Sequence, residues 1–299
     1  MKTLFYMTKR NMKIFFKDKG MFFTSLITPI ILLVLFVTFL AKVYKDSFFN
    51  SMPEGVNVSE SLINGIVNGQ LFSSLLAVSC VTVAFCANML MVTDKVNGVK
   101  KDINITPTKK STIAMSYYFA SLFATLLVAL VGTIACFIYI AATGWYMSFA
   151  DIILILIDLF MLTLFGTALS SIVNCFLTTQ GQISAVGTIV SAGYGFICGA
   201  YMPISQMGSV MQNILAFLPG TYGTSLLKYH SLNGAFREMS GQGIPVDAIS
   251  SIRDNIDCNL YFFGNQVSIA AMYGIMLGSI MLLIGVYILI SRLSAKKKK

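Results

Sequence analysis

Six long apolar stretches constrain the fold of this chain more than any other feature of its sequence. They lie at residues 20–41, 71–93, 113–142, 152–177, 183–201 and 267–291. Each is close to or above the roughly 20 residues that a helix needs to cross a bilayer. Together they contain one charged residue, Asp158. Because backbone amides in hydrocarbon must pair within their own segment, the stretches predict helices rather than strands. We therefore expect an all-α membrane protein, with a single transmembrane domain over residues 1–299.

The composition agrees with this expectation. Hydrophobic residues make up 56% of the chain and charged residues only 11%, whereas a soluble globular domain carries about a quarter charged residues. This deficit excludes an ordinary soluble protein, a disordered protein and a coiled coil. The six cysteines show no paired spacing typical of a metal site, and they do not indicate an extracellular disulfide framework.

The charges between the spans indicate the orientation of the chain. Residues 1–19, 94–112 and 292–299 carry net charges of +5, +3 and +5, whereas residues 42–70 and 202–266 each carry −1. Basic segments mark the cytoplasmic side of a membrane protein. Six spans with both termini in the cytoplasm fit this alternation, and the acidic loops then face outward.

The first 19 residues form a basic amphipathic segment. At 100° per residue, one face holds Leu4, Phe5, Met12, Phe15 and Phe16, and the other holds Lys2, Lys9, Arg10, Lys13 and Lys17. We expect an interfacial helix whose lysines face anionic lipid headgroups. The alternative is a solvated basic lead-in to the first span. The lysines at 296–299 predict a topology anchor rather than a nucleic-acid site, because no groove-reading residues accompany them.

The segment 94–110, between the second and third spans, predicts a short helix. Val96, Val99 and Ile103 are spaced as on one helix face, and Pro107 ends the pattern. Gly98 has no side chain and would allow a close approach to a partner. A short apolar knob between two spans suits docking into a groove on a soluble protein. The alternative is a loop that rests on lipid.

The long segment 202–266 has two unlike parts. Residues 202–229 are apolar, contain one charge, Lys228, and are interrupted by proline and glycine. Their apolar runs are too short to span a bilayer, so we expect a re-entrant or interfacial segment. Residues 231–257 are polar and rich in glycine, which predicts a small exposed loop.

No catalytic motif is visible in the sequence. The only histidine, His230, falls in the predicted outer segment, without visible partners for a zinc site or a catalytic triad. No phosphate-binding glycine loop is present, so we expect this chain to bind no ATP. Energy for uphill transport then comes from a partner ATPase or from an ion gradient.

Asp158 is a candidate for proton coupling because carboxylates inside a membrane span are usually functional. However, it follows Asp151 by seven residues, which is about 10 Å along a helix. We therefore expect Asp158 near the outer end of its span, where it reaches the interface or a water-filled crevice.

Several motifs occur in an order that one family shares. Asp18 precedes a span with Pro29; Asp94, Gly98, Asp102, Thr106 and Pro107 form an acid–Gly–acid–Thr-Pro pattern; Cys198 to Pro203 follow the fifth span; and Leu218, Pro219, Gly220, Thr221 and Tyr222 come before the last outer part. With these motifs and six spans, the chain resembles the permease subunit of type-2 ATP-binding-cassette (ABC) exporters. It departs from that family in having Asp94 in place of the usual glutamate and Cys198 in place of the usual serine.

The resemblance implies a division of work among several chains. Two permeases, two copies of this chain or this chain and a paralogue, would face each other in the membrane lipid above two ABC ATPases. The ATPases would hold ATP and Mg²⁺, whereas this chain would bind no cofactor, metal or nucleic acid and would not itself be an enzyme. The complex would lie in the cell membrane of a bacterium and export a hydrophobic or amphipathic substrate such as a drug, a peptide or a lipid-like molecule.

The resemblance also assigns roles to particular residues. Coupling to the ATPase would involve Asp94, Val96, Gly98, Val99, Asp102, Ile103 and Pro107. An outer gate would involve Gly199, Pro203, Pro219 and Tyr222.

Two other functions remain open from the sequence. The chain could be a secondary transporter that uses Asp158, which proton-coupled uptake without an ATPase would support. It could also be a membrane-embedded enzyme or assembly scaffold, which lipid processing by the purified chain would support.

Overall fold

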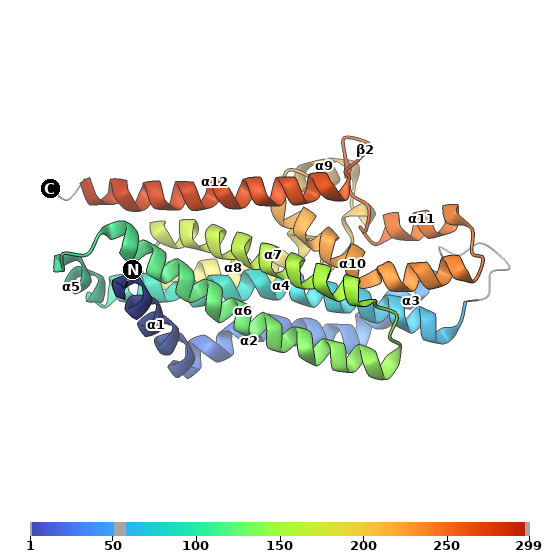
Figure 1. Ribbon diagram of the computed structural model, residues 1–299, viewed down its shortest axis with the longest axis horizontal. Coiled ribbons are helices and arrows are strands. Elements are labelled where there is room, and N and C mark those ends of the chain that lie inside the picture. The colour runs from blue at the N-terminus through green and yellow to red at the C-terminus, as the bar shows by residue number, and fades with distance from the viewer. Residues whose placement is uncertain (1, 51–57, 297–299) are drawn as a thin grey trace.

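The chain folds almost entirely into helices, most of which run along one elongated bundle (Figure 1). The structure is a computed structural model and describes residues 2–50 and 58–296, so residues 51–57 of the predicted first outer loop and the lysines at 297–299 lie outside it. In chain order the elements are α1 (Lys2–Lys17), α2 (Lys19–Leu35), the π-helix η1 (Phe36–Leu40), α3 (Ala41–Asn50), α4 (Glu60–Val96), α5 (Val99–Ile105), α6 (Lys110–Thr143), α7 (Phe149–Phe176), α8 (Gln180–Ile197), the 3-10 helix η2 (Ile204–Gln206), α9 (Ser209–Leu215), α10 (Pro219–Gly241), α11 (Val246–Asn255), β1 (Tyr261–Phe262), β2 (Asn265–Gln266) and α12 (Ile269–Lys296). The two strands form a small antiparallel hairpin.

Five helices of the described residues are long and apolar enough to cross a membrane. They are Lys19–Asp46, which joins α2, η1 and α3, then α4, α6, α7 and the Ile269–Leu293 part of α12. The prediction of an all-α membrane protein is therefore confirmed. α8 overlaps the predicted fifth span but has only 18 residues and is not among the five.

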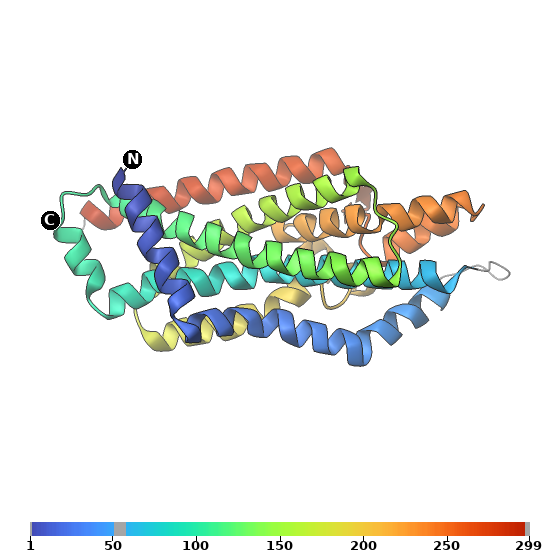
Figure 2. The same cartoon turned by 60° about the horizontal axis from the view of Figure 1, so that its bottom comes forward.

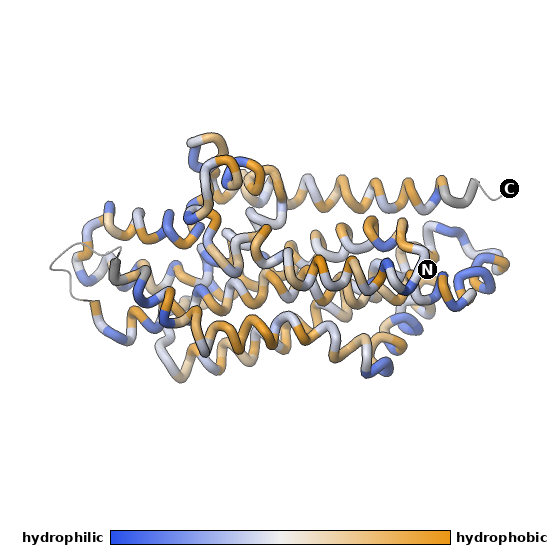
Figure 3. Tube along the Cα trace, turned by 180° about the vertical axis from the view of Figure 1, so that it is seen from behind, coloured by the Kyte–Doolittle hydropathy of each residue, from blue (hydrophilic) through white to orange (hydrophobic). Residues whose placement is uncertain are grey.

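The bundle has two distinct ends. α1, α5 and the last turns of α12 lie at the left of Figure 1, and we call this the basic end because lysine and arginine dominate its charges. α3, the start of α4, the end of α10 and α11 lie at the other end, which we call the opposite end. Apolar residues dominate the middle of the bundle, whereas hydrophilic residues gather toward its ends (Figure 3).

α4 is the central helix of the bundle. It packs on α2, α6, α7, α8 and α10, and every residue from Gly65 to Asn88 is buried. α7 comes especially close at Gly166, where a Cβ would lie 2.9 Å from the carbonyl oxygen of Cys80. Small residues allow such close helix crossings in membranes. Nearby, the Asn88 side chain donates to the hydroxyls of Ser170 and Ser171, each at 2.7 Å, so helix contacts pair these polar groups away from water.

A small helical layer covers the opposite end, where the sequence predicts loops. α4 begins at Glu60 rather than at residue 71, and its 37 residues span about 55 Å at 1.5 Å per residue. α10 continues to Gly241, and its Leu232, Phe236 and Met239 join one buried cluster with residues of α4 and α11. The prediction of an exposed loop at residues 231–257 is therefore wrong. These three apolar residues have the spacing of one helix face. The polar residues and glycines between them dominate the composition, so the segment was predicted as a loop.

α1 crosses the basic end at an angle to the other helices (Figure 2) and packs on α6. Its buried residues are Thr8, Asn11 and Phe15, whereas Phe5 is 64% exposed. The predicted apolar face is thus divided between the protein and its surroundings. The chain then turns at Asp18, whose carboxylate accepts from the Met21 backbone N–H at 3.1 Å and caps α2.

Candidate functional site

The predicted coupling segment contains two helices rather than one. α4 runs through Asp94 to Val96, and the chain then turns at Gly98, whose φ of +80° suits glycine. α5 starts at Val99. Val96 therefore does not share a helix with Val99 and Ile103, and the predicted apolar stripe of these three residues is wrong. The sequence signal that was missed is Gly98 as a turn residue between two helices.

The exposed side of α5 presents a different apolar residue. Ile105, at the end of α5, is 85% exposed, whereas Ile103 is partly buried against the bundle. Asp102 lies exposed in the first turn, and Pro107 is exposed just beyond the helix. Ile105, and not Ile103, is thus the apolar side chain of α5 most available to a partner.

Asp94, near the end of α4, bonds to two other helices at the basic end. Its carboxylate accepts from Arg10 of α1 at 2.5 Å and from the Tyr117 hydroxyl of α6 at 2.6 Å, and it is only 4% exposed. Burial lowers the pKa of Arg10, but the hydrogen bond and the charge of Asp94 raise it by more, so the guanidinium stays charged. Asp94 therefore joins α1, α4 and α6, and Arg10 faces the protein instead of the predicted lipid-facing side.

Lys95, the next residue, joins α4 to the end of α7. Its ammonium donates to the carbonyls of Cys175 at 2.6 Å and of Leu177 at 2.9 Å. These carbonyls lie at the carboxyl end of α7, where a helix lacks internal donors and favours a cation. Asp94 and Lys95, in the last turn of α4, thus bond to three neighbouring helices.

The four predicted gate residues lie within residues 199–222, which run from the end of α8 into the first turn of α10 and which we call the gate segment. Gly199 follows α8 with a φ of +74°, and Pro203 begins the short turn η2. Pro219 is the first residue of α10. The Tyr222 hydroxyl donates to the carbonyl of Ala216 at 2.6 Å, which fixes α9 against α10. The gating role of these residues stays a prediction.

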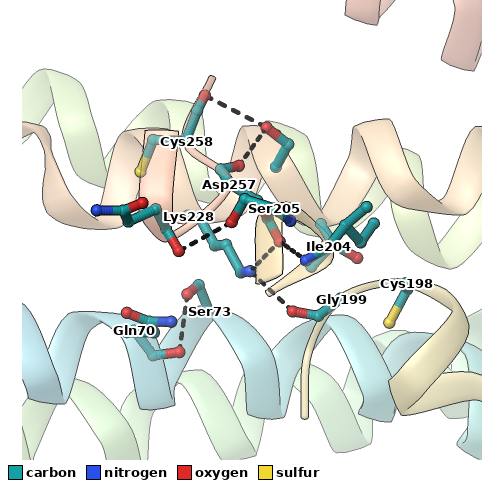
Figure 4. A network of polar contacts seen from close by, with 12 residues as sticks. Gln70, Ser73, Cys198, Gly199, Ile204, Ser205, Lys228, Asp257 and Cys258 are labelled. Carbon is teal, nitrogen blue, oxygen red and sulfur yellow. Dashed lines mark hydrogen bonds and ion pairs between the residues drawn. The ribbon is translucent and has the colours of Figure 1, made fainter. Parts of the chain in front are cut away.

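A buried ion pair holds this segment in place (Figure 4). The Lys228 ammonium, from α10, donates to the Gly199 carbonyl at 2.8 Å and to Asp257 Oδ2 at 3.3 Å. Asp257 also accepts the backbone N–H groups of Ile204 at 2.6 Å and Ser205 at 2.9 Å. The Lys228 side chain is fully buried. Its position as the one charge in an apolar stretch was the sequence signal for this site, but nothing in the sequence identified Asp257 as its partner.

An open groove of about 970 Å³ lies beside the gate segment, between α2 and α8. Apolar side chains such as Ile31 of α2 and Ile183 of α8 line it, and Met89 of α4 lies against it. Ile31 is 51% exposed, although it lies within a candidate membrane span. This face of the bundle is therefore open and mostly apolar.

Asp158 lies inside the bundle, not at its surface. It is 1% exposed, and its two oxygens bond to His230 Nδ1 at 2.6 Å and to the Tyr273 hydroxyl at 2.5 Å. The prediction that Asp158 reaches the interface or a crevice is wrong because α10 and α12 cover it. His230 belongs to α10 and has a carboxylate partner. No group of three His, Cys, Asp or Glu residues able to hold a metal ion occurs within residues 2–50 and 58–296.

The family model for the ABC-2 type transporter matches residues 2–230 of the chain. The chain belongs to the ABC-2 type transporter family. No curated protein matches it significantly. The match confirms the predicted resemblance to an ABC-2 type permease. Membrane subunits of this family work with ABC ATPases. In this ABC-2 type transporter, the matched region contains Lys228 but ends before its partner Asp257.

Proposed function

We propose that this chain is the permease of an ATP-driven exporter that moves a hydrophobic or amphipathic substrate out of the cell. Two permeases, identical or paralogous, work with two ABC ATPases that bind at the basic end and hold ATP and Mg²⁺. The observation that carries the proposal is α5, a short helix with an exposed apolar residue, which follows the last turn of α4, where Asp94 and Lys95 bond to three other helices.

The proposed coupling passes from α5 into the central helix. Burial of Ile105 in a groove of the ATPase contributes about 1.5–3 kcal/mol. A displacement of α5 passes through the Gly98 turn to the last turn of α4. Asp94 then carries it to α1 and α6, and Lys95 carries it to α7. Ion pairs and hydrogen bonds with little exposure make this junction stiff enough to move as a unit.

The basic end faces the cytoplasm in this proposal, as expected from its excess of lysine and arginine. α8 makes the sixth crossing together with the folded segment that follows it. The support for an even number of crossings is that α1 and the last turns of α12 lie at the same end of the bundle (Figure 1). The gate segment and α11 then lie toward the outside.

The groove between α2 and α8 is the proposed path for the substrate and the side that faces the second permease. Its apolar side chains, with hydroxyls of Thr28, Thr188 and Ser191 among them, suit a molecule with both apolar and polar parts. An open apolar face of this size within a membrane span also suits contact with a partner helix.

The test is ATPase association of variants that change α5 alone. Ile105→Asp places a charge where the interface is proposed to be dry, and a buried unpaired carboxylate costs several kcal/mol. We expect Ile105→Asp to lose most of the ATPase that co-purifies with wild-type permease, and Val99→Asp to lose less because Val99 is less exposed. Asn104→Asp is the matched control, because Asn104 is exposed on the same helix.

The comparison is made at equal amounts of inserted permease. Retention of ATPase by Asn104→Asp but not by Ile105→Asp supports coupling through α5. Equal retention by wild type, Ile105→Asp and Asn104→Asp would remove the main support for the proposed function.

A further inference from the structure

A second pocket lies at the opposite end, outside the gate segment and outside the groove between α2 and α8. Its volume is about 360 Å³, and it lies between α10, the end of α11, the β hairpin and the start of α12. Arg253, Gln266 and Ser268 provide hydrogen-bond donors along its lining, and Met272 is an apolar member. Neither the coupling route nor the substrate path uses these residues.

Within the part of the chain that the structure describes, Arg253 is held in place without a carboxylate partner. Its guanidinium carbon lies 5.2 Å from the ring centroid of Tyr229 and 4.8 Å from that of Phe236, so two aromatic rings fix the side chain. Its backbone carbonyl accepts from the Cys258 N–H at 2.9 Å, which fixes the turn after α11. The buried Nε of Arg253 has no hydrogen-bond acceptor among the described residues.

The two acids closest to Arg253 along the sequence bond to other groups. Asp254 accepts from the Asn259 side chain at 2.8 Å and from the Tyr261 hydroxyl at 3.1 Å. Asp257 is occupied by Lys228 and two backbone N–H groups. A guanidinium with two acids so close along the chain would ordinarily pair with one of them. Here the fold directs both carboxylates elsewhere and leaves an oriented cation at the pocket.

The remaining donors in the pocket favour an anion with several oxygens. The Gln266 side chain is exposed, and the Ser268 hydroxyl oxygen accepts from the Ala271 N–H at 3.3 Å, which leaves its hydrogen free to donate. Arginine binds phosphate through paired N–H groups. The pocket also lies at the first residues of the Ile269–Leu293 candidate span, the depth at which a phospholipid carries its phosphate.

We propose that this pocket binds a phosphate group, with Arg253 as its cationic ligand and Gln266 and Ser268 as additional donors. The phosphate is carried by a phospholipid headgroup or is free in solution, and these two sources share the same recognition chemistry.

The experiment measures thermal unfolding of the full chain in a sugar detergent at constant ionic strength. Three probes are compared: inorganic phosphate, a short-chain phosphatidylglycerol and the diacylglycerol with the same acyl chains. We expect stabilisation of the wild type by a phosphate-bearing probe and none by the diacylglycerol. Response to the lipid alone assigns the source to a headgroup, and equal response to inorganic phosphate assigns it to the free ion.

Two variants and one control test the site itself. Arg253→Gln removes the cation, and Gln266→Glu adds a charge at the exposed rim without altering the aromatic contacts. Each is expected to weaken the phosphate response at least about tenfold, since Arg253→Gln removes an attracting charge and Gln266→Glu adds a repelling one. Asn265→Glu adds the same charge one residue earlier in the hairpin, outside the lining, and should respond as wild type. An equal response of Gln266→Glu and Asn265→Glu, or no response of the wild type to either phosphate probe, overturns the proposal.

Discussion

Replacement of Asp257 by asparagine tests the buried ion pair between Lys228 and Asp257 most severely. The side chain of Lys228 is fully buried, and among the described residues its only other acceptor is the Gly199 carbonyl. Asparagine keeps the size of aspartate but leaves the ammonium without a counter-charge. Asparagine also has only one side-chain oxygen, so it cannot accept all three hydrogen bonds that the Asp257 carboxylate accepts from Lys228, Ile204 and Ser205. Removal of one partner from a buried ion pair costs about 3–5 kcal/mol. The N–O distance of 3.3 Å is long for an ion pair. We therefore expect the free energy of unfolding to fall by about 3 kcal/mol, the lower end of this range.

The assay is unfolding of purified protein in mixed micelles, with helicity as the signal. Asp247→Asn, at an exposed position in the first turn of α11, is the control and should change stability by less than about 0.5 kcal/mol. Lys228→Met added to Asp257→Asn should recover part of the loss because it removes the unpaired charge. Stability of Asp257→Asn equal to that of the control, or no recovery in the double variant, would refute the reasoning.

Three further predictions concern the bundle and its orientation. Asp158→Asn should keep ATP-driven transport, because asparagine still bonds to His230 and Tyr273; complete loss in a folded, assembled complex would instead favour proton coupling. Gly166→Val should lower the midpoint of thermal unfolding, since its Cβ meets the backbone of α4 at 2.9 Å, whereas Gly132→Val points to open space and should not. In intact cells, an impermeant thiol reagent should label Ser240→Cys but not Thr106→Cys. Native Cys258 should stay unlabelled because burial raises its pKa to about 12.

The spans were predictable because apolar composition over about 20 residues has a direct physical cause in the bilayer. The helical layer at the opposite end was not, because Leu232, Phe236 and Met239 are separated by polar residues and glycines. Their burial depends on contacts with α4 and α11. A helix that continues into water cannot be found from hydropathy alone.

Polar pairs between residues far apart in the chain could not be predicted from the sequence. Asp94 and Arg10 are separated by 84 residues and Asp158 and His230 by 72, and no periodicity relates them. Lys228 could be singled out because a lone charge in an apolar run needs a partner. Asp257 could not, since it lies in a polar stretch among other acids. The sequence predicted a short helix between Asp94 and Pro107. It did not predict the left-handed turn at Gly98, which separates Val96 from α5 and leaves Ile105 as the exposed apolar residue.

In the proposed function, ATP acts on the membrane bundle through α5, and one distance measurement tests this coupling directly. Spin labels are placed at Ile31 of α2 and Ile189 of α8, both exposed, in a chain whose native cysteines have been replaced. The permease is reconstituted with its ABC ATPase, and the distance between the labels is measured with and without ATP. We expect ATP to change this distance in the wild type and in Asn104→Asp but not in Ile105→Asp. No change in the wild type, or the same change in Ile105→Asp, would contradict it.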